Sequence, residues 1–116
     1  MEKERYEKLL SITNRSAFFS ASVQNLKLKF QSDCVFAYDG HFFTASMELL
    51  GYLSLNEEKQ KAVVIDDHGL PVLVNLGPYN EFPKIAETTY NEATLSYFTE
   101  YEKLIKKTEG IFNEDR

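Results

Sequence analysis

The stretch CVFAYDGHFFTA, residues 34–45, consists of two apolar runs joined by Asp39-Gly40. An Asp-Gly pair between two β-rich runs is the strongest short-range signal for a hairpin, since a type I′ turn needs positive φ at both central residues. We therefore predict an antiparallel hairpin with its turn at Asp39-Gly40. Ser46 follows the second strand and is a suitable N-cap for a short helix that begins at Met47.

A second hairpin is predicted further along the chain. Residues 62–66, AVVID, and residues 70–74, LPVLV, are rich in β-branched side chains, and Asp67-His68-Gly69 separates them. Pro71 cannot donate a hydrogen bond to a β-ladder. We therefore expect Pro71 to lie at the start of its strand or on a sheet edge.

The N-terminal third of the chain has a mixed pattern. Residues 2–13 have apolar positions at helical spacing and charged residues on the other face, which predicts an amphipathic helix at the periphery of the domain. Residues 16–23 fit either a continued helix or an extended segment. Leu26, Leu28 and Phe30 alternate with two lysines, and this period of two predicts a half-buried strand.

The C-terminal third predicts one long helix. Pro83 fits a first helical turn, and apolar residues then recur every three or four positions. Acidic residues lie early in this segment and lysines lie late, as the helix dipole prefers. Gly110 is expected to end the helix, and the tail, residues 111–116, is expected to fray.

Together these elements predict an α+β fold. In this fold a small antiparallel sheet built from two β-hairpins is packed by a short middle helix and a long C-terminal helix. The length of 116 residues is typical of one domain, so residues 1–116 are expected to form a single domain.

Composition excludes several classes of protein. The formal net charge of -5 argues against a nucleic-acid partner, which would favour a basic surface. The apolar runs are far shorter than the roughly 20 residues that a membrane span needs. Cys34 is the single cysteine, so no intramolecular disulfide is expected, and a lone thiol fits a reducing cytosol. We therefore expect a cytoplasmic protein that binds neither nucleic acid nor membrane.

The two histidines are the side chains that titrate nearest to neutral pH. His41 and His68 both lie beside hairpin turns, and Asp66 and Asp67 precede His68 directly. One hypothesis is a metal or small-ligand site made by these four residues at adjoining hairpin tips. The alternative, which we favour, is that turns select Asp and Gly for backbone reasons and tolerate a neighbouring His.

Motifs for enzymatic chemistry are absent from the sequence. There is no G-x-S-x-G, no phosphate-binding glycine loop and no H-E-x-x-H spacing. Cys34 lies in an apolar run, where a thiol is inert. An enzyme that uses Asp66, Asp67 and His68 is the least favoured hypothesis. We predict no enzymatic activity, no catalytic residue and no cofactor.

Aromatic residues are numerous, with nine Phe and seven Tyr. Tyrosine suits protein interfaces, because its ring is apolar and its hydroxyl can form a hydrogen bond. Tyr90, Tyr97 and Tyr101 follow one stripe of the long predicted helix, and Phe42 points away from its neighbour Phe43 on a strand. Packing on the sheet explains these side chains most simply. An interface made by Tyr90, Tyr97, Tyr101 and Phe42 is the alternative.

Two stretches of the chain resemble small uncharacterised proteins of tailed bacteriophages. They are YDGHFFTA followed by MELL, residues 38–45 and 47–50, and VIDDHGLPV, residues 64–72, which leads into a Tyr-rich helix. The resemblance covers roughly residues 34–107 and implies a viral origin, and it assigns no functional residue.

These observations predict a non-catalytic protein-interaction domain encoded by a phage. It would be a small virion-associated or assembly protein, or a binder of a host protein. Its place would be the cytoplasm of the host bacterium or the virion, and its partner would be a second copy, a phage protein or a host protein. The alternative is the small-ligand or metal-binding domain that uses His41 and His68.

Overall fold

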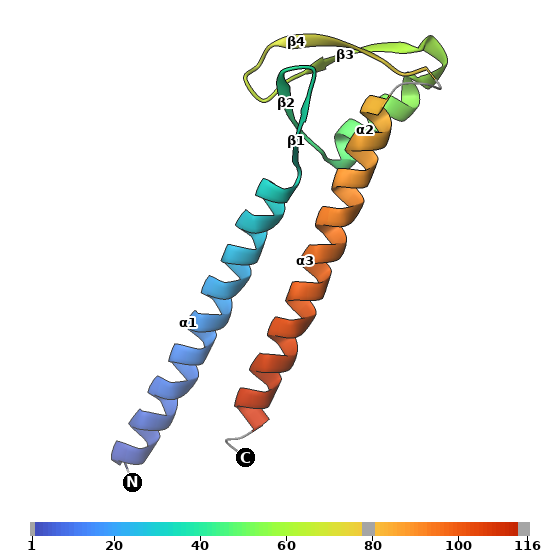
Figure 1. The fold of residues 1–116 in the computed structure, drawn as a ribbon. Coiled ribbons are helices and arrows are strands. Elements are labelled where there is room, and N and C mark those ends of the chain that lie inside the picture. The colour runs from blue at the N-terminus through green and yellow to red at the C-terminus, as the bar shows by residue number, and fades with distance from the viewer. Residues whose placement is uncertain (1, 78–80, 114–116) are drawn as a thin grey trace. The chain divides into compact units, whose positions relative to one another are not determined.

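A computed structural model describes residues 2–77 and 81–113, with side chains at positions 3, 5, 7, 15–77 and 81–109 (Figure 1). The elements are α1 (Glu2–Asp33), β1 (Val35–Tyr38), β2 (His41–Thr44), α2 (Met47–Leu55), the short 3-10 helix η1 (Glu57–Lys59), β3 (Lys61–Ile65), β4 (Pro71–Asn75) and α3 (Glu81–Asn113). The predicted α+β class, the two hairpins, the short middle helix and the long C-terminal helix are confirmed.

Helix α1 is much longer than predicted, and the strand predicted around Leu26, Leu28 and Phe30 is wrong. The helix continues through residues 16–23 and ends at Asp33. Leu26 and Phe30 are also four positions apart, which places both on one helical face, and both are half-buried whereas Leu28 is exposed. Leucine and lysine are good helix formers. The alternation of apolar residues with lysines, which predicted a strand, therefore belongs to a helix.

The first hairpin forms as predicted. Asp39 and Gly40 have φ values of 50° and 79°, and Tyr38 pairs with His41 across the turn. Both central residues thus have the positive φ of a type I′ turn. The predicted N-cap is also present, because the Ser46 hydroxyl accepts a hydrogen bond from the Leu49 N–H at 3.0 Å.

Replacing Ser46 with alanine is expected to lower the free energy of unfolding by about 1 kcal/mol, because an N–H of the first turn of α2 loses its acceptor. Urea denaturation followed by circular dichroism measures this change. Ser46→Asp is the matched control and should keep stability near that of the wild type. An alanine variant as stable as the wild type would contradict the capping role.

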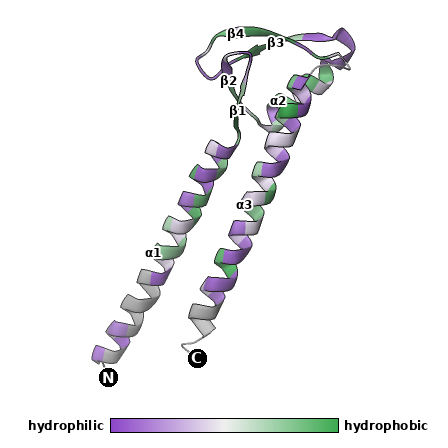
Figure 2. Cartoon of the chain, in the orientation of Figure 1, coloured by the Kyte–Doolittle hydropathy of each residue, from purple (hydrophilic) through white to green (hydrophobic). Residues whose placement is uncertain are grey.

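The second hairpin is a separate two-stranded sheet rather than an extension of the first. Pro71 is the first residue of β4, as predicted, and pairs with Ile65. The backbone N–H of Asp67 donates to the carbonyl oxygen of Phe42 at 2.8 Å, so the turn of the second hairpin is bonded to β2. The middle residues of β3 and β4 are hydrophobic, whereas the turn between the strands is hydrophilic (Figure 2).

Helix α3 begins at Glu81, so Pro83 lies in its first turn as predicted. The helix continues through Gly110 to Asn113, and the predicted end at Gly110 is wrong. A glycine inside a helix costs only about 1 kcal/mol relative to alanine, which a long helix tolerates. Of the tail predicted to fray, residues 114–116 lie outside the described residues.

The chain divides into two compact units. Unit 1 comprises residues 1–29 and 96–116, and unit 2 comprises residues 30–95. The buried core among the described side chains lies entirely in unit 2, and its largest fully buried members are Phe43, Phe82 and Val74. That these units fold together as one domain stays a prediction.

Candidate functional site

The turn of the second hairpin is organised around the Asp66 carboxylate, which is buried. Its Oδ1 accepts hydrogen bonds from the backbone N–H groups of His68, at 2.9 Å, and Leu70, at 2.8 Å. Its Oδ2 lies 2.8 Å from His41 Nδ1 on β2. An aspartate that accepts from the backbone two residues further along forms an Asx turn. Asp66 therefore shapes its own turn and joins it to the first hairpin.

The same hydrogen bonds set the charge of Asp66. The Leu70 N–H lowers the pKa of this carboxyl most, the His41 side chain and the His68 N–H lower it further, and burial opposes them by raising it. The net pKa lies below its ordinary value, so Asp66 is ionised at neutral pH. An ionised carboxylate only accepts hydrogen bonds. The hydrogen shared with His41 therefore belongs to Nδ1 of the imidazole.

The alternative metal or ligand site consists of His41, His68, Asp66 and Asp67. The structure joins one pair of these residues by a side-chain contact. His41 contacts Asp66, whereas the Asp67 carboxylate accepts from the Thr44 hydroxyl at 2.9 and 3.0 Å, and the His68 side chain is exposed. Within residues 2–77 and 81–113, no group of three His, Cys, Asp or Glu side chains could hold a metal ion. The metal-site alternative stays a prediction.

The four residues of the predicted interface have different surroundings. Tyr90 is half-buried, packs against the core of unit 2 and meets the Phe30 ring edge-on at 6.2 Å. Tyr97 is also half-buried, whereas Tyr101 is 38% exposed and Phe42 is 51% exposed. The tyrosine stripe is therefore not one continuous exposed surface.

Cys34 is buried at the end of α1. Burial raises the pKa of its thiol, and the nearby Asp33 carboxylate raises it further. The thiol is therefore protonated at neutral pH and a poor nucleophile.

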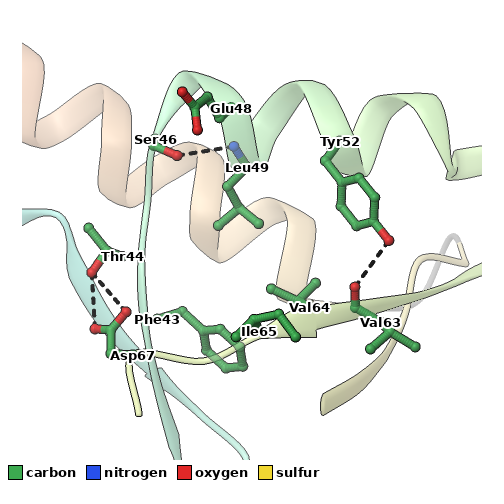
Figure 3. A pocket seen from close by; sticks show the side chains of 10 residues that line it. All are labelled: Phe43, Thr44, Ser46, Glu48, Leu49, Tyr52, Val63, Val64, Ile65 and Asp67. Atoms are coloured by element: carbon green, nitrogen blue, oxygen red, sulfur yellow. Dashed lines mark hydrogen bonds between the residues drawn. The ribbon is translucent and has the colours of Figure 1, made fainter. Parts of the chain in front are cut away.

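A pocket of about 470 Å³ lies between α2 and β3 (Figure 3). The Tyr52 hydroxyl donates a hydrogen bond to the Val63 carbonyl oxygen at 3.1 Å, and the Thr44–Asp67 hydrogen bonds lie at the other end of the pocket. The sequence did not reveal this pocket, because Tyr52 and Val63 lie on different elements, 11 positions apart, and match no motif. Its lining residues are Phe43, Thr44, Ser46, Glu48, Leu49, Tyr52, Val63, Val64, Ile65 and Asp67.

No protein-family model, curated protein or solved structure matches the chain. The resemblance to phage proteins therefore stays a prediction. Among the described residues, no helix has the length and apolar character required to cross a membrane.

Proposed function

We propose that the protein is a non-catalytic protein-interaction domain that binds a second copy of itself through α3. The predicted role as a small phage-encoded virion-associated or assembly protein is compatible with such self-association. The observation that supports the proposal is a row of large apolar side chains on the part of α3 that belongs to unit 1.

The row consists of Phe98, Tyr101 and Ile105. Phe98 is 60% exposed, Tyr101 is partly exposed and Ile105 is half-buried. Successive residues of an α-helix are about 100° apart, so spacings of three and four residues place these side chains on one face. None of the described side chains of unit 1 is among the buried residues. The described side chains of unit 1 therefore form no buried core of the kind that usually stabilises packed helices.

Within unit 1, two contacts between α1 and α3 use another face of α3. Lys29 Nζ donates to Ser96 Oγ at 3.2 Å, and Lys107 Nζ lies 5.7 Å from the centre of the Phe18 ring. The contact made by Lys29, later in α1, uses the earlier α3 residue Ser96, whereas the contact made by Phe18, earlier in α1, uses the later α3 residue Lys107. The two helices therefore run antiparallel. Ser96 and Lys107 lie roughly opposite the Phe98 row on the helix.

A second copy of the chain is a suitable partner for this row. Two antiparallel helix pairs can form a four-helix bundle, in which such apolar faces become the core. A two-fold axis would place the Phe98 row of one copy against the Phe98 row of the other.

Phe98→Glu is expected to weaken self-association by roughly tenfold or more, because it places a charge in the apolar centre of the interface. Sedimentation velocity over a range of protein concentrations measures the effect. Leu55→Glu is the matched control, since Leu55 is 83% exposed but lies on α2 in unit 2. Equal weakening by both variants, or none by Phe98→Glu, would rule out the α3 face as the interface.

A further inference from the structure

The geometry points to a second binding site, independent of self-association through α3. We infer that the pocket between α2 and β3 binds an extended peptide in which apolar residues alternate with lysine or arginine. The peptide would add to the open edge of β3 as a third strand. Three observations support this inference: the backbone groups on that edge, the role of Tyr52, and the charge of the pocket.

The open edge follows from the hydrogen-bond pattern of the second hairpin. Asp66 N–H bonds to the Leu70 carbonyl, and Leu76 N–H bonds to the Gln60 carbonyl. In an antiparallel pair, hydrogen-bonded and non-hydrogen-bonded positions alternate. The backbone groups of Lys61, Val63 and Ile65 therefore point away from β4. Among the described strands β3 pairs with β4 alone, so this edge lacks a strand.

The pocket lies along this edge. Val63, Val64 and Ile65 form one side of it, and Leu49 and Tyr52 of α2 form the other (Figure 3). Tyr52 donates to the Val63 carbonyl, which is the bond that a neighbouring strand would otherwise provide. The volume of about 470 Å³ is within the usual range for ligand pockets, about 300–1,000 Å³. Strand addition to an exposed edge is an established mode of peptide recognition.

The lining determines which peptide fits. Glu48 and Asp67 are the acidic residues of the pocket, and no lysine or arginine lines it. Val63 and Ile65 are exposed apolar side chains on the edge strand. A strand whose successive side chains point to opposite faces can place apolar residues beside Val63 and Ile65. Its alternate basic residues can then reach the carboxylates, and the net charge of -5 favours their approach.

The test uses the full chain and a fluorescein-labelled hexapeptide of alternating lysine and valine. Fluorescence anisotropy is expected to show saturable binding. Methylating the backbone nitrogens of alternate residues that face β3 should weaken binding by roughly tenfold, because the strand hydrogen bonds are lost while charge is kept. A glutamate–valine peptide should bind more weakly still. Equal binding of the methylated peptide would overturn strand addition, and equal binding of the acidic peptide would overturn the charge preference.

Protein variants locate the site. Val63→Pro removes an outward-facing N–H from the edge beside the pocket, and Leu73→Pro does the same on the opposite edge of the hairpin. We expect Val63→Pro to lose peptide binding and Leu73→Pro to keep it. Tyr52→Phe is expected to strengthen binding by roughly threefold, since it frees the Val63 carbonyl. Peptide binding that persists in Val63→Pro, or that disappears only when Phe98→Glu blocks self-association, would contradict the site.

Discussion

Replacing Phe82 with alanine is expected to lower the free energy of unfolding by about 3–5 kcal/mol. Phe82 is fully buried, and its ring lies 5.5 Å from Phe36, 5.1 Å from Tyr38 and 5.0 Å from Phe43, measured between ring centroids. The substitution removes the ring that joins α3 to the first hairpin and leaves a cavity among three aromatic side chains. Urea denaturation followed by tyrosine fluorescence measures the loss.

Phe42→Ala is the matched control for Phe82. Phe42 is the neighbour of Phe43 on β2, but half of its surface is exposed, so its removal should cost less than about 1 kcal/mol. If both alanine variants lose the same stability, the aromatic cluster around Phe82 is not the centre of the core.

Replacing Asp66 with alanine is expected to lower the melting temperature by about 5 °C or more. The variant leaves the N–H groups of His68 and Leu70 without their acceptor and breaks the link to His41. Differential scanning calorimetry at neutral pH measures the effect. Asp66→Asn keeps one acceptor oxygen, so it should lose less stability than the alanine variant.

The contribution of Asp66 also depends on pH. Its pKa in the folded protein lies below the ordinary value, so the unfolded chain binds a proton more readily than the folded one. The stabilisation is therefore fully present above about pH 4 and is lost as the pH falls through the folded pKa. The difference in melting temperature between wild type and Asp66→Ala should shrink on acidification below pH 4. A difference that is constant down to pH 2 would contradict this role of the carboxylate.

Local signals predicted the hairpins well. Asp39-Gly40 supplied the positive φ values of its turn, and Ser46 capped α2, because both effects depend on a few neighbouring residues. The prediction of a strand around Leu26 and Phe30 was wrong, because the local pattern there is ambiguous. Its apolar residues satisfy a period of two and a spacing of four at once, and only the surrounding helix decides between them.

The sites depend on contacts between distant parts of the sequence. The sequence around Asp66 is typical of a solvated turn. The burial of Asp66 could not be predicted from it, because the carboxylate contacts His41, which is 25 positions away. The tyrosine stripe of α3 is divided, because Tyr90 lies in unit 2 against a core and Tyr101 lies in unit 1, where no described side chain is buried. Sequence periodicity identified the stripe but could not show which of its residues are covered.

Sedimentation equilibrium of the wild-type chain measures whether two copies associate. The weight-average mass is expected to rise with concentration from 13.4 kDa toward twice that value, as two copies pair through α3. A mass that stays at 13.4 kDa from low micromolar to several hundred micromolar protein would contradict self-association.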